Sequence, residues 1–227
     1  PTYGQSIVSW SGNSQANASI GHGLSSAPDL VITKSRTDAN DWVIDVSNIT
    51  GTTGDALRLN NTSSITANAS ILPTKPSSSV FYNSTDNGSF NVSNKNYISY
   101  CFHSVTGYSK FGSYSGTGNA NNAVTLGFRP AFLMVKRINS TEDWFMFDST
   151  RNPLNTVTQR LKANTTDADG AYSHLIPRDE KFVLKGSKEK YQNVQKQVTF
   201  DWSQRKRYDF VINNIIIAII HFYYCLH

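Results

Sequence analysis

Short apolar runs separated by polar turns recur along most of the chain. Residues 29–34 (DLVITK) and 42–46 (WVIDV) are rich in β-branched side chains and flank a polar turn, which predicts a β-hairpin. Alternation predicts another strand at residues 57–60 (LRLN), and the longest aromatic strand is expected at 97–103 (YISYCFH). Further short strands are expected at residues 7–10 and 80–83, with a loop at 60–79.

The fold class follows from the spacing of these runs. No window holds an apolar pattern of 3.6-residue period long enough to predict a helix. Short strands separated by turn signals are typical of antiparallel sandwiches. The sequence therefore predicts an all-β chain of antiparallel β-sandwich modules of the jelly-roll or lectin-like kind.

The same pattern occurs twice. APDLVITKSRTDANDWVIDVS near residue 28 matches RPAFLMVKRINSTEDWFMFDS near residue 130. The matched pairs are Pro28 with Pro130, Lys34 with Lys136, Asp41 with Asp143, Trp42 with Trp144, Trp10 with Tyr114, Gly12 with Gly116, Leu57 with Leu161 and Asn60 with Asn164. A period near 100 residues is about that of a whole small domain, so two tandem modules are predicted.

The predicted modules span residues 7–110 and 111–186. No flexible linker separates them, so we expect the two units to dock. The second unit matches incompletely, because no counterpart of the YISYCF strand follows residues 182–186. Residues 187–227 form a divergent basic and apolar segment instead.

This C-terminal segment has three interpretations. Residues 215–226 are too short for a membrane span, which needs about 20 apolar residues, although the preceding RKR would suit a membrane flank. A buried or intersubunit strand is the favoured interpretation. An altered or misread sequence is the third.

Charge distribution argues against a nucleic-acid partner. Residues 1–184 carry 14 basic and 13 acidic residues, whereas residues 185–227 carry 7 and 3, so most of the net charge of +5 lies in the tail. A nucleic-acid interface would need basic residues gathered on one face.

Low charge and many Asn, Ser and Thr residues indicate exposed sheet and turn surfaces that associate with little repulsion. No signal peptide is expected, because residues 1–4 lack a basic and an apolar region.

The titratable residues do not form a recognisable catalytic pattern. The five histidines are scattered, and surface or capping roles are expected for them: His22, His103, His174, His221 and His227. SGTGNANN lacks the Lys-Ser/Thr of a phosphate loop, and TDANDW and TTDADGAY lack the spacing of a calcium loop, although Asp167 and Asp169 are a weak calcium candidate. Cys101 is expected to be a buried small apolar residue, and with Cys225 it cannot make a disulfide framework.

The repeated tryptophans allow two interpretations. Trp42 and Trp144 each follow an acidic turn, which is how a sugar-binding ring with hydrogen-bonding neighbours would be placed. Repetition in both copies also fits a core anchor at the start of a strand. Core packing is the favoured interpretation for both.

The segments GLSSAPDLVITK, GFRPAFLMVKR, DWFMFDS and YISYCFHSVTGYSKFGSYSGTG resemble a domain of structural proteins in marine bacteriophages. This domain recurs in tail-fibre-like and other virion proteins of phages that infect cyanobacteria and related ocean bacteria. The resemblance covers roughly residues 7–184, and the family offers no catalytic residues to transfer.

The sequence thus predicts a non-enzymatic bacteriophage virion protein of a tail fibre, neck or capsid appendage, acting in multivalent attachment or assembly at the particle surface. The expected partners are other virion proteins, copies of itself and host-surface glycans, with no nucleic acid, cofactor, metal or membrane span; the binding residues stay unknown. A polysaccharide-degrading enzyme would need a clustered carboxylate pair, and none is convincing. The alternative is a glycosylated secreted or viral surface adhesin, which ten Asn-X-Ser/Thr sequons would favour.

Overall fold

The computed structural model of the chain describes residues 3–84, 90–118, 122–150 and 160–165, and the backbone of residues 215–219. Strands hold 39% and helix 3% of these residues, and the sheets are antiparallel. The prediction of an all-β chain built from antiparallel sheets is therefore confirmed. The finer prediction of two separate sandwich modules is not confirmed, because the sheets of the two units pack on each other.

The first unit forms a six-stranded sheet, the first sheet. Its strand order is β1 (Gln5–Ser11), β8 (Asn96–Phe102), β3 (Leu30–Ser35), β4 (Val43–Asp45), β5 (Asp55–Arg58) and β6 (Thr66–Ala67). The expected hairpin is β3 and β4, which pair in antiparallel register with Ile32 opposite Ile44. Glycine is required where β1 ends, because a Cβ on Gly12 would lie 2.1 Å from the carbonyl oxygen of Val92.

The second unit forms a five-stranded sheet, the second sheet. Its strand order is β12 (Leu161–Lys162), β11 (Trp144–Asp148), β10 (Phe132–Arg137), β13 (Ile215–Ile219) and β9 (Lys110–Tyr114). The five strands of the second sheet have the same order as β1, β8, β3, β4 and β5 of the first, because in each sheet the strand that comes last in the sequence lies between the first and the second strand of that sheet. β13 thus occupies in the second sheet the place that β8 occupies in the first.

The register of β13 agrees with this equivalence from both sides. Ile98 of β8 lies opposite Lys34 of β3 and Ser9 of β1. Ile216 of β13 lies opposite Lys136 and Ser113, which are the repeat equivalents of Lys34 and Ser9. The sequence showed no counterpart of the YISYCF strand, yet a segment of different composition fills its position. Part of the C-terminal segment therefore belongs to the repeat fold.

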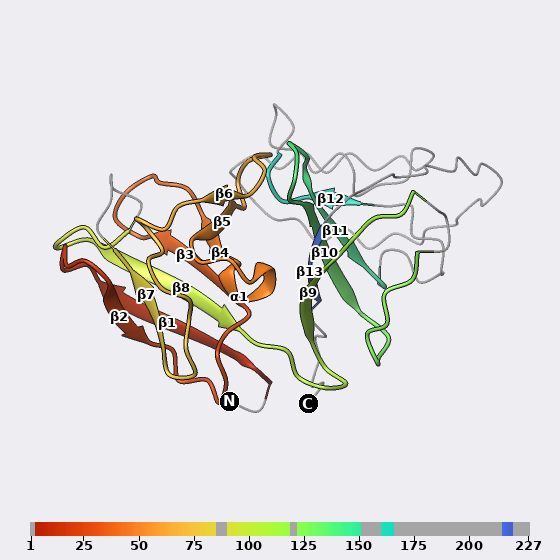
Figure 1. Cartoon of the computed structure of the whole chain (residues 1–227), viewed down its shortest axis with the longest axis horizontal. Helices are drawn as coiled ribbons and strands as arrows, with labels where there is room; N and C mark the ends of the chain where they lie inside the picture. The colour runs from red at the N-terminus through yellow and green to blue at the C-terminus, as the bar shows by residue number, and fades with distance from the viewer. Residues whose placement is uncertain (1–2, 85–89, 119–121, 151–159, 166–214, 220–227) are drawn as a thin grey trace, which may run out of the picture.

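Both faces of the first sheet are covered over much of their area. Two short strands, β2 (Ala18–Gly21) and β7 (Val80–Asn83), pair with each other and cover the outer face. Their side chains pack there on Val31 and Cys101, and a second outer cluster forms around Val43 and Phe90. The one-turn helix α1 (Ser47–Thr50) follows β4 and ends at Gly51, whose φ of 82° favours glycine. Figure 1 shows α1 between the two sheets.

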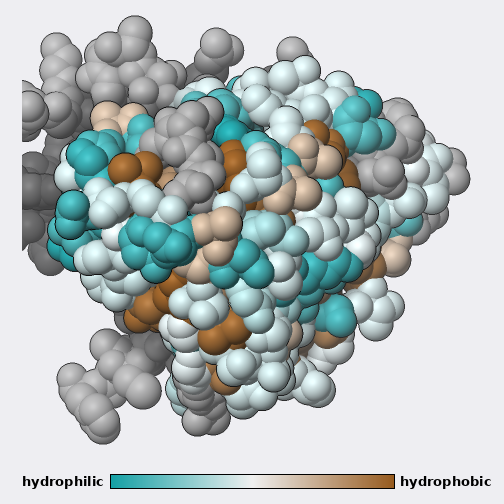
Figure 2. Space-filling view, turned by 60° about the vertical axis from the view of Figure 1, so that its left-hand side comes forward, coloured by the Kyte–Doolittle hydropathy of each residue, from teal (hydrophilic) through white to brown (hydrophobic). Residues whose placement is uncertain are grey.

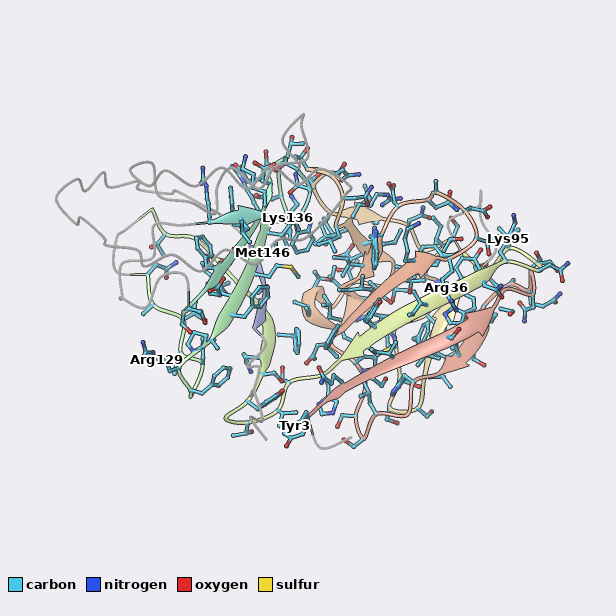
Figure 3. The ribbon with its side chains drawn as sticks, turned by 180° about the vertical axis from the view of Figure 1, so that it is seen from behind. Tyr3, Arg36, Lys95, Arg129, Lys136 and Met146 are labelled. Atoms are coloured by element: carbon cyan, nitrogen blue, oxygen red, sulfur yellow. The ribbon has the colours of Figure 1, made fainter. Side chains whose placement is uncertain are left out.

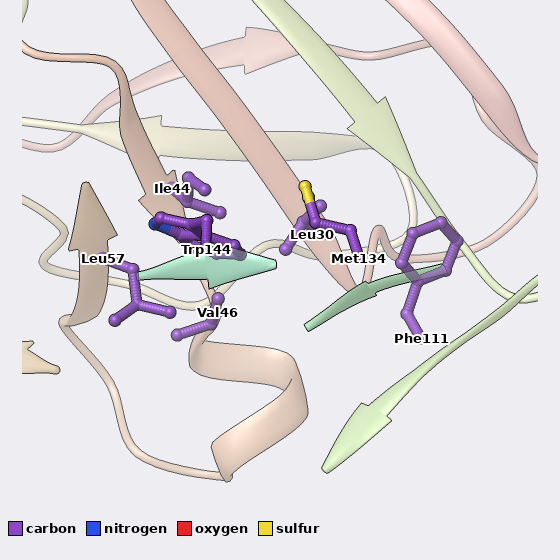
Figure 4. Packing of buried hydrophobic residues seen from close by; sticks show 7 residues of the cluster. All are labelled: Leu30, Ile44, Val46, Leu57, Phe111, Met134 and Trp144. Atoms are coloured by element: carbon purple, nitrogen blue, oxygen red, sulfur yellow. The ribbon is translucent and has the colours of Figure 1, made fainter. Parts of the chain in front are cut away.

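The inner face of the first sheet packs against the second sheet, as expected for docked units. Their shared core contains residues of both units: Leu30, Ile44, Val46, Leu57, Phe111, Met134 and Trp144. Figure 4 shows the indole of Trp144 among the side chains of Ile44, Val46 and Leu57. The repeat equivalence places the same face of each unit at this contact, because Ile32 and its equivalent Met134 both pack in this core. The largest buried cluster among the described residues therefore lies between the two repeats.

Candidate ligand-binding surface

A polar cluster holds the start of β4 in the first unit. The carboxylate of Asp41 accepts hydrogen bonds from Arg58 Nε and Asn60 Nδ2, both at 2.8 Å. The Asn60 side chain in turn accepts the backbone N–H of Trp42 at 3.0 Å. These contacts fix the backbone from which the Trp42 side chain projects.

The second unit repeats this cluster, with Lys162 in the place of Arg58. Asp143 accepts from Asn164 Nδ2 at 2.8 Å and forms an ion pair with Lys162, and Asn164 accepts the Trp144 N–H at 2.7 Å. Burial alone would raise the pKa of Asp143, but the hydrogen bonds from Lys162 and Asn164 and the positive charges of Lys162 and Arg160 lower it. Because every partner is intramolecular in both copies, the cluster has a structural role.

The two equivalent tryptophans have different environments. Trp144 is 1% exposed in the shared core, and its Nε1–H donates to the carbonyl oxygen of Arg58 at 2.8 Å. Trp42 is only partly buried and stacks on Tyr100, with ring centroids 6.3 Å apart and planes inclined by 27°. Core packing is thus confirmed for Trp144, whereas Trp42 remains partly open to solvent.

Trp42 and Tyr100 form, with Ile7, an aromatic surface on the inner face of the first sheet. Ile7 and Ile32 flank Tyr100 on the neighbouring strands, so their side chains share its face. Ile7 is 68% exposed, although its repeat equivalent Phe111 is 5% exposed in the shared core. The second sheet therefore leaves this part of the inner face open.

The aromatic surface offers flat apolar rings of the kind on which the apolar face of a sugar ring stacks. Arg58, which binds Asp41 through Nε, lies opposite Val43, so its side chain lies on the outer face of the sheet and not beside these rings. Sequence reasoning considered Trp42 for this role but missed Tyr100. The alternation of YISYCF could have indicated it, because Tyr97, Ser99 and Cys101 share one face and Tyr100 lies on the other.

The side of the first unit that lies away from the second sheet is mostly polar. Figure 2 turns the first unit toward the viewer, and its brown areas are small and separated by pale and teal residues. Figure 3 shows Arg36 and Lys95 at the end of the first sheet that lies far from the second sheet. Lys95 there is paired with Asp38 at 2.9 Å.

Lys136 is a buried amine at the contact between the two units. It is 0% exposed, and its Nζ donates to the carbonyl oxygens of Arg137 at 2.8 Å and Thr62 at 3.2 Å. Burial lowers its pKa to about 8, although the nearby carboxylates of Glu142 and Asp143 act in the opposite direction. Lys136 thereby links β10 of the second unit to a loop of the first.

Asp45 is a buried carboxyl on the outer face of the first sheet. Its Oδ1 accepts the N–H of Ser47 at 2.9 Å. Burial raises its pKa to about 6, against the hydrogen bonds from Ser47, and the nearby Asp55 adds to the rise.

We expect Asp45→Asn to stabilise the protein at neutral pH. The folded-state pKa lies above the unfolded one, so the stability that this carboxyl contributes is complete below about pH 4 and is lost as pH rises through about 6. The variant should gain about 3 kcal/mol in the free energy of unfolding at pH 7 and less than about 1 kcal/mol at pH 4, measured by urea denaturation. If the variant gains the same free energy of unfolding at both pH values, ionisation of Asp45 does not destabilise the fold.

The histidines that the structure describes have structural contacts. His22 is 2% exposed, so of the expected surface or capping roles only the capping role fits: its Nδ1 accepts the Leu24 N–H at 3.0 Å, so Nε2 carries the proton given to the Ser77 carbonyl oxygen. His103 lies within hydrogen-bond distance of the Ser104 carbonyl oxygen, at 2.9 Å. Four predicted candidates lie outside the described residues: His174, His221, Asp167 and Asp169. His227 and Cys225 also lie outside them.

Other sequence-based expectations concern the same described residues. Cys101 is confirmed as a buried thiol at 0% exposure, and burial raises its pKa to about 12. Nowhere in the described part do three or more His, Cys, Asp or Glu side chains gather in a group that could hold a metal ion. Among the described residues, no helix has the length and apolar character needed to cross a membrane.

These features define a β-rich protein of two repeats with a shared core and a partly open aromatic surface. The chain belongs to the family described as a domain of unknown function, DUF7483, whose model matches residues 1–199. No curated protein and no solved structure matches it.

Proposed function

We propose that this protein is a non-enzymatic structural component of a bacteriophage virion, placed in a tail fibre, neck or capsid appendage, and that it attaches by multivalent contacts. The observation that carries the proposal is the aromatic surface of Ile7, Trp42 and Tyr100. The fold leaves this surface partly open, whereas Phe111 and Trp144, the repeat equivalents of Ile7 and Trp42, are buried. The resemblance of both repeats to phage virion domains supports the placement in the particle.

The use of the ionisable groups supports a binding role rather than a catalytic one. Asp41 and Asp143 hold the starts of equivalent strands, and Lys136 bonds to backbone carbonyl oxygens. Asp29 accepts the N–H and the hydroxyl of Ser104 at 2.7 and 2.8 Å. Each group thus stabilises the fold through contacts within the chain.

We further propose that both repeats derive from one sandwich module. The equivalent strand orders, the register of β13 and the repeated polar cluster support this relation. In this arrangement the inner face of each module's main sheet is covered by the main sheet of the other module. Only the part of the first sheet's inner face that carries the aromatic surface then remains open to a ligand.

The ligand that suits the aromatic surface best is a host-surface glycan. Weak stacking on one surface would be strengthened where several copies act together, because linked sites raise the effective concentration of one another.

The alternative of a glycosylated adhesin has less support from the environment of the sequons. A glycan is attached at Asn Nδ2, which must be free and exposed. In Asn48, Asn60, Asn91 and Asn164 this nitrogen already donates to Pro28 and Pro76, Asp41, Gln15 and Asp143, respectively. Asn83 is 1% exposed. Five of the ten sequons are therefore poor acceptors in the folded chain.

A glycan array with the purified chain tests the attachment role. Trp42→Ala should weaken binding to the recognised glycan at least tenfold, because it removes the larger ring of the surface. Tyr3→Ala is the matched control, since Tyr3 is 57% exposed but lies before β1 and packs its ring against Tyr108. Binding that survives both Trp42→Ala and Tyr100→Ala, or a wild-type chain that binds no glycan, would refute the glycan role.

A further inference from the structure

β1 presents a free edge at the end of the first sheet. Its flanking residues bond toward β8: Gly12 N donates to the Lys95 carbonyl oxygen, and His103 N to the Gly4 carbonyl oxygen, both at 2.8 Å. Because backbone groups alternate in direction along an antiparallel strand, the even-numbered residues of β1 face β8. The odd-numbered residues Gln5, Ile7, Ser9 and Ser11 therefore direct their N–H and C=O groups away from the sheet.

These outward groups have no hydrogen-bond partner among the described residues. β1 pairs only with β8 in that part of the chain, and no turn or side chain there bonds to the backbone of the four odd-numbered residues. Their side chains are exposed as well, and Ile7 is the most exposed large apolar residue among those described, at 68%. The edge and the side chains beside it are thus open together.

The composition of this edge differs from that of the other edges of the two main sheets. β6 and β12 are two-residue strands. β9, the repeat equivalent of β1, is five residues long and includes an exposed Lys110 and Gly112. Short length, Lys and Gly weaken strand pairing at an edge. β1 is seven residues long, QSIVSWS, with no charge and no proline. Among these edges it alone lacks the usual features that prevent pairing with another chain.

We propose that β1 is an interaction surface for a second copy of this chain, through antiparallel pairing of β1 with β1 across a twofold axis at Val8. The outward odd-numbered residues must form the hydrogen-bonded pairs, so the register must match odd residues with odd residues. One register pairs all four outward residues of each strand. In this register Gln5 lies opposite Ser11 of the second copy, and Ile7 lies opposite Ser9.

The strand is self-complementary in this register. No like charges meet, and the two Ile7 side chains become diagonal neighbours on one face, within reach of each other. In the first sheet the shared core is formed mainly by β3, β4 and β5, and it reaches β8 only at Phe102, opposite Gln5, so the rest of β1 lies beyond it. Isologous pairing of this kind closes after two copies, so the product is a dimer.

The dimer would bring two aromatic surfaces to the same side. A twofold axis perpendicular to a sheet keeps the same face of both sheets on one side, so Tyr100 and Ile7 of each copy continue one surface. This consequence rests on the proposed attachment function and deepens it, since it names the partner that makes binding bivalent. The pairing itself follows from the edge.

Sedimentation velocity of the full chain between about 1 and 100 μM tests the proposal. The wild-type chain should form a dimer, and Ser9→Pro should raise its dissociation constant at least tenfold, because proline removes an outward N–H and leaves those that face β8. Ser9→Lys should do the same by placing two like charges near the axis, and it decides the matter if the proline variant fails to fold. Ser113→Lys is the matched control, because Ser113 is the exposed equivalent on β9.

Two results would overturn the inference: a wild-type chain that stays monomeric over the whole range, or a dimer that both Ser9 variants leave unchanged. This measurement contains no glycan. A monomer that still binds a glycan would therefore refute the dimer alone, and a dimer that binds none would refute the attachment role alone.

Discussion

Replacing Trp144 by alanine is expected to lower the free energy of unfolding by about 3–5 kcal/mol. The indole is 1% exposed in the shared core, and it also donates to the Arg58 carbonyl oxygen of the first unit. Alanine would leave a cavity between the sheets and an unsatisfied carbonyl group. Urea denaturation followed by circular dichroism measures the loss.

Trp42→Ala is the matched variant, because Trp42 is the repeat equivalent and its N–H is held by the same kind of cluster. It is partly exposed, so we expect a loss of about 1–2 kcal/mol. Equal losses for the two variants would contradict the unequal environments of the two residues.

Ile217→Pro is expected to destabilise the protein by about 3 kcal/mol. Ile217 lies opposite Gly112 of β9 and Val135 of β10, so it is in a strand with neighbours on both sides. Proline removes a backbone donor from this ladder and does not fit a central strand. The change is measured by the same urea denaturation.

Ile217→Val is the control, because valine keeps the N–H and the β-branched side chain. It should cost no more than about 1.5 kcal/mol. If the proline variant is as stable as the wild type, β13 does not complete the second sheet.

Much of the first sheet could be predicted from local pattern. The strands β3, β4, β7 and β8 lie where β-branched or aromatic runs end at polar turns. The repeat also predicted which residues are equivalent, and the polar clusters of Asp41 and Asp143 confirm it. These features depend on short-range sequence, which one chain shows directly.

Other elements could not be predicted because they depend on tertiary contacts. β2 lies within a polar loop, and its pairing with β7 makes it a strand. α1 is a single turn, too short for a 3.6-residue pattern to emerge. β13 pairs through its backbone, so it can replace β8 without sharing its sequence.

The candidate site shows the same limit. Trp42 and Trp144 have similar neighbours in the sequence, and only the contact between the sheets decides which one is buried. The free edge of β1 likewise depends on strand order, which places both β1 and its repeat equivalent β9 at sheet edges although β9 carries a lysine and a glycine and is shorter.

The central structural claim is that the two repeats fold as one body around a shared core, and scanning calorimetry of the full chain tests it most directly. We expect one transition, with calorimetric and van't Hoff enthalpies that agree, and we expect Trp144→Ala to shift that whole transition to lower temperature. Two separate transitions, of which Trp144→Ala moves only one, would contradict the shared core.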